Sequence, residues 1–240
     1  MLSRGAHEAQ GTESVTGDLA TGEGIGAAVA GVDVVVHCAG SAKGDEAKAG
    51  NLVEAASRAC VRHIVYISVV GADRIPMAGA VDRAMFGYFG AKLAAERVIA
   101  DSGIPWTSLR ATQFFDLTFK TVEALARLPV IPVPAGFRFQ PIDTAEVADR
   151  LTALALGGPA GVVPPIAGPR IYDMADLVRG YLLATGKRRP IVRVGTPGKA
   201  AAAIRAGANL APEHAVGVRT WEAFLAERSE ALHGGRYLIA

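Results

Sequence analysis

The chain has 240 residues, of which 50% are hydrophobic and 20% are charged, so it is long and apolar enough to bury a sizeable core. Its 25 basic and 23 acidic residues give a net charge of +2, which excludes the large basic field that nucleic acids or anionic membranes attract. It contains neither the apolar run of a signal peptide nor the roughly 18 uncharged apolar residues of a membrane span. We therefore expect a cytoplasmic protein that binds neither nucleic acid nor membrane.

The two cysteines and five histidines give no sign of a disulfide framework or a metal site. Cys38 and Cys60 fit neither disulfide spacing nor the usual zinc spacing, and the histidines lie far apart in the sequence. We expect both cysteines to be small buried hydrophobic residues in a reducing compartment, and we expect no metal.

The first pattern in chain order is a glycine-rich segment. Residues 22–27 match the G-x-G-x-x-G/A fingerprint of dinucleotide-binding loops and follow a short expected strand at residues 13–16. The fingerprint also needs a long crossing helix and a charged residue about twenty positions later. Here the helix must end near Gly31, and Cys38 or Ala39 stands where the charged residue is needed. We therefore interpret the segment as an ordinary glycine-rich loop.

Alternating strands and helices follow. Unbroken apolar runs at residues 32–38 and 63–70 predict strands that are covered on both faces. Between them, residues 45–60 carry apolar side chains at helical spacing, which predicts a strand–helix–strand unit with a right-handed crossover. The pattern recurs with a helix that ends at residues 91–100 and a strand at residues 105–109. The sequence therefore predicts an α/β fold with a doubly wound parallel sheet.

Beyond Pro129 the pattern changes, because prolines separate short apolar strands and individual helices. The capping-box sequence Asp143-Thr144-Ala145-Glu146 predicts a helix that continues to Leu156. Three further helices are predicted at residues 173–185, 198–208 and 220–227.

One pair of residues has the spacing that acid–base chemistry needs. Tyr88 and Lys92 are four positions apart, hence on one face of a helix. A fixed positive charge stabilises a phenolate, so we expect the pKa of Tyr88 to fall toward a useful range. Ser68 ends the preceding strand, where ligands bind in open α/β sheets, and its hydroxyl can polarise the same substrate oxygen. The same Tyr–Lys spacing also occurs on exposed helices without any catalytic role.

These residues belong to segments that resemble the short-chain dehydrogenase/reductase superfamily, and within it the atypical, NmrA-like NAD(P)H-binding branch that includes quinone reductases. The resemblance covers almost the whole chain and implies a Rossmann-like sheet that binds a nicotinamide dinucleotide, with a smaller substrate region closing over it. The segments are TGDL (16–19), GVDVVVHCAG (31–40), YIS (66–68), VGAD (70–73), YFGAKLAAE (88–96), PWTSLRATQF (105–114) and QPIDTAEVA (140–148).

The resemblance also implies roles for individual residues. Tyr88 would donate the proton and Lys92 would hold the nicotinamide ribose. The adenine end would be lined by Asp18 and Leu19, the ribose and pyrophosphate by Cys38, Ala39 and Gly40, and the nicotinamide end by Arg110, Ala111 and Thr112.

The start of the chain differs from the family pattern. Family members begin with a strand, a glycine-rich loop and a helix that hold the pyrophosphate, and this first βα unit is not found here. Residues 1–4 resemble the end of the second strand, where family members often carry an arginine for the 2′-phosphate of NADP. Arg4 thus favours NADP(H) over NAD(H). We expect the missing unit, on the order of thirty residues, to be encoded upstream of Met1.

Residues 1–158 are therefore expected to form an N-terminally incomplete NAD(P)-binding domain, and residues 159–240 a smaller, partly interleaved α+β substrate region. The expected activity is the reduction of a small carbonyl or quinone by NAD(P)H, in a monomer or homodimer. Two alternatives share these features: a non-catalytic NAD(P)-sensing regulatory protein, and a sugar-nucleotide epimerase or dehydratase.

Overall fold

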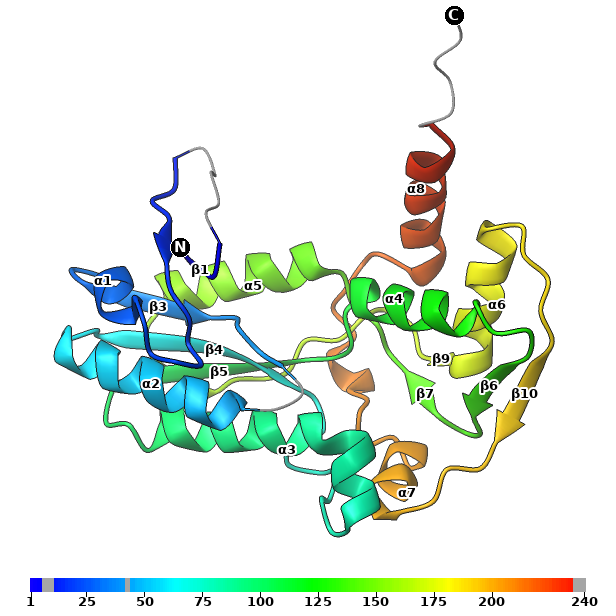
Figure 1. Ribbon diagram of the computed structural model, residues 1–240, viewed down its shortest axis with the longest axis horizontal. Coiled ribbons are helices and arrows are strands. Elements are labelled where there is room, and N and C mark those ends of the chain that lie inside the picture. Colours follow the sequence, from blue (N-terminus) through cyan, green and yellow to red (C-terminus); the bar gives the residue numbers. More distant parts are fainter. Residues whose placement is uncertain (6–10, 42–43, 235–240) are drawn as a thin grey trace, which may run out of the picture. The chain divides into compact units, whose positions relative to one another are not determined.

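The computed structural model describes residues 1–5, 11–41 and 44–234 (Figure 1). The chain divides into two compact units, and each is assembled from separate stretches of the sequence. Unit 1 comprises residues 1–73, 83–110 and 149–164, and unit 2 comprises residues 74–82, 111–148 and those from 165 onward.

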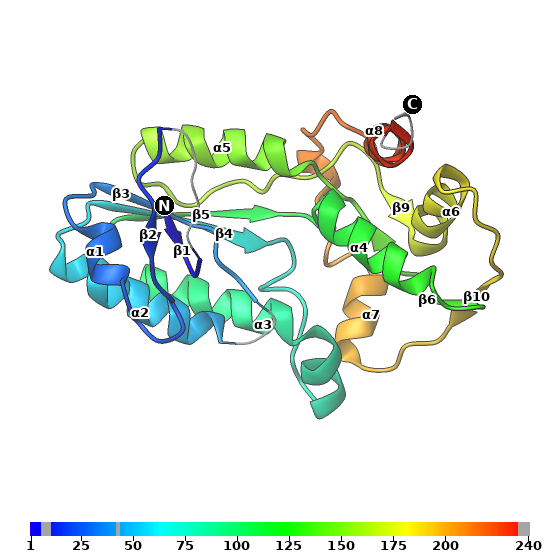
Figure 2. The ribbon, with the colours of Figure 1, turned by 45° about the horizontal axis from the view of Figure 1, so that its top comes forward.

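Unit 1 is built on a four-stranded sheet in the order β3-β4-β5-β8, formed by Val34–His37, His63–Val69, Trp106–Ala111 and Gly161–Val162. The pairs β3–β4 and β5–β8 are parallel. All seven residues of β4 are buried, as expected for an unbroken apolar run. In Figure 2, helices α2 (Asp45–Arg58) and α3 (Ala80–Ala100) lie on one face of this sheet and α5 (Thr144–Leu156) on the other. The predicted doubly wound α/β class is confirmed.

The core of unit 1 lies between β4 and the helices on its α2 side. Ile64 and Tyr66 of β4 are fully buried there with Ala56 of α2 and Ala95 and Ile99 of α3. Alanines at these helix positions let the helices approach the sheet closely. The apolar residues whose spacing predicts α2 therefore include those of the helix face that packs on the sheet.

The chain start forms a separate parallel pair, β1 (Leu2–Ser3) with β2 (Val15–Thr16). Helix α1 (Ile25–Val29) follows and has only five residues, so the short helix predicted from the glycine-rich segment is confirmed. Gly24 has φ 72°, and a Cβ added to it would lie 2.4 Å from the carbonyl oxygen of Thr16. This glycine therefore permits a close backbone approach next to β2.

Unit 2 contains two small sheets and most of the later helices. β6 (Ile131–Pro134) pairs in parallel with β10 (Ile191–Val194), and β7 (Arg138–Phe139) pairs antiparallel with β9 (Tyr172–Asp173). The helices are α4 (Phe115–Leu125), α6 (Met174–Ala184), α7 (Lys199–Arg205), the 3₁₀ turn η1 (Pro212–His214) and α8 (Trp221–Gly234). The predictions of α5, α6, α7 and α8 are confirmed, whereas α4 was not predicted.

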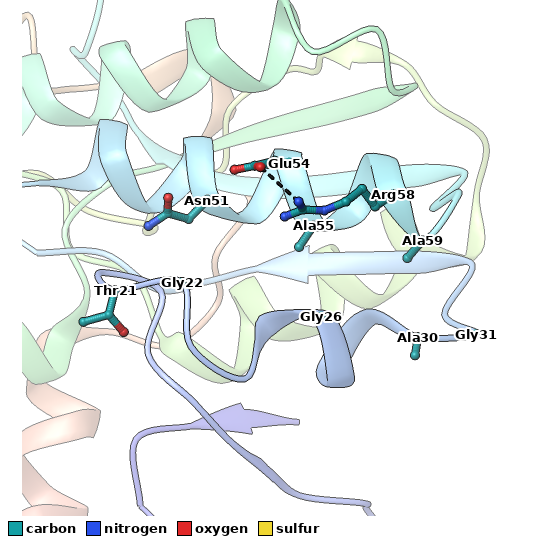
Figure 3. A pocket seen from close by; sticks show the side chains of 10 residues that line it. All are labelled: Thr21, Gly22, Gly26, Ala30, Gly31, Asn51, Glu54, Ala55, Arg58 and Ala59. Atoms are coloured by element: carbon teal, nitrogen blue, oxygen red, sulfur yellow. Dashed lines mark ion pairs between the residues drawn. The ribbon is translucent and has the colours of Figure 1, made fainter.

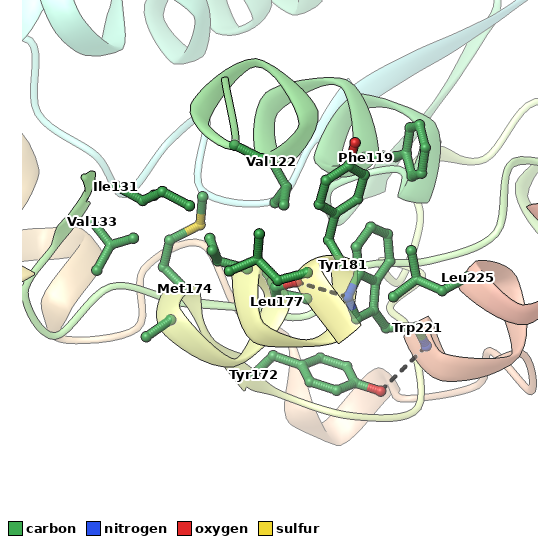
Figure 4. Close-up of a cluster of buried hydrophobic side chains, with 14 of the residues drawn as sticks. Phe119, Val122, Ile131, Val133, Tyr172, Met174, Leu177, Tyr181, Trp221 and Leu225 are labelled. Carbon is green, nitrogen blue, oxygen red and sulfur yellow. Dashed lines mark hydrogen bonds between the residues drawn. The ribbon is translucent and has the colours of Figure 1, made fainter. Parts of the chain in front are cut away.

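Trp221 lies at the centre of the unit 2 core (Figure 4). Its side chain is fully buried, its indole nitrogen donates to the carbonyl of Leu177 at 3.2 Å, and its ring stacks on Phe224. The hydrogen bond satisfies the one polar atom that burial of the indole would otherwise leave unpaired. Tyr172 donates its hydroxyl to Glu222 and accepts from the backbone nitrogen of Trp221, which fixes the start of α8.

Two sequence expectations are wrong. Cys38 and Cys60 are both exposed free thiols rather than buried residues, because β3 ends at His37 and Cys60 lies in the turn that leaves α2, with φ 56°. The capping box at α5 is only half formed. Asp143 accepts from the nitrogen of Ala145 at 2.7 Å, but Glu146 accepts from the backbone nitrogens of residues 218 and 219 instead of closing the box.

In the part of the chain that the structure describes, every helix is too short or too polar to cross a lipid bilayer.

Candidate functional site

The structure places the three candidate catalytic residues in unit 1. Tyr88 and Lys92 lie on α3, and the Lys92 ammonium is 5.8 Å from the centre of the Tyr88 ring. The same ammonium lies 3.5 Å from the carbonyl oxygen of Ile67, the neighbour of Ser68 on β4. Ser68 is buried, and its hydroxyl finds no hydrogen-bond partner among the described residues. A buried unsatisfied hydroxyl at the end of a strand is available to a ligand.

Lys92 is held by a carboxylate that the sequence reasoning missed. Its side chain is 4% exposed, and its ammonium lies 3.4 Å from Oδ2 of Asp45, the first residue of α2. The other carboxylate oxygen of Asp45 accepts from the backbone nitrogen of Ser41 at 2.7 Å. A Cβ added to Gly40 would lie 2.4 Å from the Lys92 ammonium. The absence of a side chain at Gly40 therefore makes room for this ion pair.

Glu96 lies one turn after Lys92 on α3 but is not its partner. Glu96 instead accepts from the guanidinium of Arg110 at 3.0 and 2.8 Å and from the hydroxyl of Ser108 at 3.1 Å. Arg110 also pairs with Asp73 at 2.7 Å. The bidentate geometry of arginine with a carboxylate favours this pairing over the local one.

The electrostatics of the site differ from the sequence expectation. Burial, and next the carboxylate of Asp45, raise the pKa of Tyr88 to about 12, so the expected lowering by Lys92 is wrong. Asp45 neutralises the charge that would have stabilised the phenolate. Burial lowers the pKa of Lys92, while Asp45 acts against this shift. Burial and the nearby Lys92 lower the pKa of His37, the last residue of β3, to about 4.

Five of the predicted cofactor-binding residues line one cavity of about 550 Å³ in unit 1. They come from the end of β1, the loop after β2 and the loop after β3. Lys48 of α2 lines the same cavity and was not predicted, because it is placed there with Asp45, which the sequence reasoning also missed. The lining residues are Arg4, Asp18, Leu19, Ala39, Gly40, Ser41 and Lys48, with Leu2, Ser3, Gly17 and Ala20.

The other predicted cofactor-binding residues do not line this cavity. Apart from the lysine of α3 described above, one of them immediately precedes a lining residue in the sequence, and the rest lie at or just after the end of β5. Cys38 is exposed and immediately precedes Ala39. The guanidinium of Arg110 is bound by two carboxylates, as described above. Ala111 and Thr112 are buried in unit 2, and the Thr112 hydroxyl has no hydrogen-bond partner among the described residues. Their cofactor contacts stay predictions.

A larger cavity, of about 740 Å³, lies between α1 and α2 (Figure 3). Most of its lining residues are glycine or alanine, and its two charged residues, Glu54 and Arg58, form an exposed ion pair at 3.1 Å. The amide of Asn51 donates to the carbonyl of Leu19 at 2.8 Å. This groove carries no buried charge or unpaired reactive group, so the smaller cavity next to Lys92 is the candidate site.

Comparison with protein-family models identifies the family of the chain. A family model described as NAD(P)H-binding matches residues 3–155. No curated protein matches the chain in sequence.

Solved structures share the fold. The NADPH-dependent quinone oxidoreductase of Escherichia coli in complex with NADPH is 20% identical with a TM-score of 0.72, over 93% of this chain and 84% of that one. The triphenylmethane reductase of Citrobacter sp. complexed with NADP(H) is 20% identical with a TM-score of 0.68, over 92% and 84%. The UDP-N-acetylglucosamine 4-epimerase of Bacillus cereus is 14% identical with a TM-score of 0.64, over 100% and 89%. At these identities the likeness establishes the fold alone.

Proposed function

Because the chain belongs to the NAD(P)H-binding family, we propose that it is an NAD(P)H-dependent oxidoreductase of the atypical short-chain dehydrogenase/reductase type that reduces a small carbonyl or quinone. One observation carries the proposal: the buried Lys92, on the same helix face as Tyr88, lies directly behind Gly40, which lines the cavity of predicted cofactor residues. A proton donor one helical turn from the residue that would hold the nicotinamide ribose is the arrangement that carbonyl reduction needs.

The residues of this cavity fit a nicotinamide dinucleotide. Arg4 and Lys48 supply positive charge for phosphates, and Gly40 leaves its wall free of a side chain. Ala39 and Leu19 offer apolar surface. When bound, the reduced dinucleotide would supply the hydride. Lys92 would hold the hydroxyls of the nicotinamide ribose.

Reduction of a carbonyl also requires a proton on its oxygen, and we assign this proton to Tyr88. A phenol whose pKa is about 12 is protonated at neutral pH and can therefore act as the donor. The unpaired hydroxyl of Ser68 would donate a hydrogen bond to the same oxygen as negative charge develops there. The Lys92 ammonium lies 5.8 Å from the Tyr88 ring, but Asp45 offsets its charge, so we assign Lys92 to holding the ribose and not to lowering the pKa of Tyr88.

We further propose NADP(H) as the preferred cofactor. Arg4 is exposed and lines the cavity together with Asp18 and Leu19, the residues assigned to the adenosine end. A guanidinium there would bind the 2′-phosphate, which only NADP(H) carries.

The first test is a fluorescence titration of the protein with NADPH and with NADH, followed by assays with a panel of carbonyls and quinones. We expect saturable binding, tighter for NADPH, and oxidation of NADPH by at least one substrate. Tyr88→Phe should lower turnover of a carbonyl by about a hundredfold or more while changing NADPH affinity little. Tyr181→Phe, in the core of unit 2, is the matched control.

The outcomes separate the alternatives. Absence of binding by the folded protein would contradict the proposal. Binding without NADPH consumption across the panel would favour a dinucleotide-sensing protein, or an epimerase if a sugar nucleotide is converted without net oxidation. Unchanged carbonyl turnover in Tyr88→Phe would remove Tyr88 as the proton donor.

A further inference from the structure

Two lysines share one carboxylate at the edge of the candidate cavity. The ammonium of Lys48 lies 3.5 Å from Oδ1 of Asp45, and the ammonium of Lys92 lies 3.4 Å from Oδ2. The three side chains are only 18%, 1% and 4% exposed for Lys48, Asp45 and Lys92, respectively. Two positive charges and one negative charge leave this largely buried cluster with an excess of one positive charge.

The described groups nearest to the cluster do not supply the missing negative charge. His37 faces Lys92 from β3 and is neutral near pH 7, because burial lowers its pKa to about 4. Although Cys38 is partly exposed, neighbouring atoms remove water from its thiol and raise the pKa of that thiol, which therefore stays protonated near pH 7. Glu96 on α3 is engaged by Arg110. A partly buried ammonium without a full counter-charge has lost hydration and is stabilised by an anionic ligand.

Of the two lysines, Lys48 lines the cavity. Its ammonium donates to the hydroxyl of Ser41 at 2.6 Å, and Ser41 lines the cavity as well. The ammonium and the hydroxyl thus stand together on the α2 side of the wall, whereas Arg4 lines the cavity from the end of β1. The cavity therefore has two separate positions at which a ligand with more than one phosphate can be bound.

We propose that Lys48, assisted by Ser41, binds the pyrophosphate of the nicotinamide dinucleotide. This assignment rests on the proposed function. Asp45 links Lys48 to Lys92, the residue assigned to the nicotinamide ribose. The pyrophosphate joins the two riboses, whereas the 2′-phosphate of NADP(H) lies on the adenosine ribose, at the end assigned to Arg4. Lys48 therefore contacts a group that NADH and NADPH have in common.

The test compares how substitutions in the 240-residue chain affect its affinities for NADPH and NADH. Lys48→Met should weaken both by the same factor, about tenfold, because one charge-assisted phosphate contact is removed. Arg4→Ala should lower the affinity for NADPH much more than the affinity for NADH. Lys48→Arg keeps the charge and should restore most of the affinity. Lys187→Met, an exposed lysine of unit 2, is the matched control and should change neither affinity.

A second probe separates direct binding from an effect through Lys92. ADP carries a pyrophosphate but no nicotinamide ribose, so Lys48→Met should lower the affinity for ADP by the same factor as the affinity for NADH. If ADP affinity is unchanged while NADH affinity falls, Lys48 acts only by positioning Lys92 and the assignment is wrong. Equal NADH affinity in Lys48→Met and the unaltered protein also overturns it. If the unaltered protein binds neither dinucleotide, the proposed function fails, and this assignment fails with it.

Discussion

The ammonium of Lys92 lies 3.4 Å from the carboxylate of Asp45, and this contact determines how the Tyr–Lys pair behaves. Without Asp45, a buried lysine would tend to lose its proton and could neither bind ribose hydroxyls as a cation nor stabilise a phenolate. Asp45 acts against the lowering of the Lys92 pKa by burial, and it adds to burial in raising the pKa of Tyr88 to about 12. Tyr88 is consequently suited to be a proton donor rather than a base.

Asp45→Asn should lower the pKa of Tyr88. The amide retains an oxygen that can accept from the backbone nitrogen of Ser41, but it removes the negative charge that raises the pKa of both Tyr88 and Lys92. Tyrosinate should therefore form at a lower pH than in the unaltered protein, where the pKa is about 12. The measurement is an NMR titration of protein labelled with ¹³C at the tyrosine ζ carbon, with Tyr88→Phe assigning the signal.

Glu54→Asn is the control for this titration, because Glu54 lies on the same helix but is exposed. It should leave the Tyr88 midpoint unchanged. The role assigned to Asp45 is contradicted if Asp45→Asn and Glu54→Asn give the same midpoint.

His37 should make the stability of unit 1 sensitive to acid. Its pKa is lowered to about 4 in the folded protein from an ordinary value near 6.5. Between these two pH values the histidine is therefore neutral in the folded protein and binds a proton when the protein unfolds. The stabilisation is present in full above pH 6.5 and is lost as the pH falls through 4. The loss amounts to roughly 2 to 4 kcal/mol.

Urea denaturation at pH 7 and pH 4.5 measures this effect. The free energy of unfolding should fall less between these pH values in His37→Phe than in the unaltered protein, because phenylalanine can keep the stacking on Tyr66 but does not titrate. Identical losses in the two proteins would show that other groups are responsible.

Gly40→Ala should disable the site without unfolding the protein. The added methyl would lie 2.4 Å from the Lys92 ammonium, so the lysine must leave its place beside Asp45. Gly40 is exposed and its φ is not positive, so the backbone itself tolerates alanine. We expect dinucleotide affinity to fall by roughly tenfold or more.

Gly50→Ala is the matched control, because no atom lies within 4 Å of the added methyl and the position is inside α2. It should stabilise the protein by about 0.5 to 1 kcal/mol and leave affinity unchanged. Calorimetry and the NADPH titration test both variants. Full affinity in Gly40→Ala would mean that Lys92 does not need its observed position.

The parallel strands and their crossover helices were predictable because burial on both faces leaves an unbroken apolar run, as in β4. The start of α3 at Ala80 was not predicted, since Gly87 and Gly90 weaken the local helix signal and packing against the sheet overrides it. Helix α4 follows β5 after only three residues and was missed too.

The candidate site was predictable only as far as local spacing reaches. Tyr88 and Lys92 share a helix face whatever the rest of the chain does. The partner of Lys92 depends on where the loop after β3 places the first residue of α2. Patterns in nearby residues of the sequence do not predict that position. Glu96 was the nearest carboxylate in sequence, but Asp45, 47 positions away, is the one in contact. The same limit concealed Lys48.

Arg110 offers a last test, because its two carboxylate partners differ in burial. Glu96 is 7% exposed and Asp73 is 45% exposed. Neutralising Glu96 leaves the mostly buried guanidinium with only the exposed Asp73 as its counter-charge, whereas neutralising Asp73 leaves the buried, bidentate pair intact. Glu96→Gln should therefore lower the free energy of unfolding by about 3 kcal/mol, and Asp73→Asn by less than about 1 kcal/mol.

Urea denaturation of the two variants at neutral pH measures the difference. The control is Glu54→Gln, which removes one partner of an exposed ion pair on α2 and so reports the effect of a change of charge alone. Glu96 also accepts a hydrogen bond from the buried hydroxyl of Ser108. In Glu96→Gln this hydroxyl is left with a weaker acceptor, so adding Ser108→Ala to Glu96→Gln should restore part of the lost free energy of unfolding. Equal losses for Glu96→Gln and Asp73→Asn would mean that burial does not set the strength of these two ion pairs.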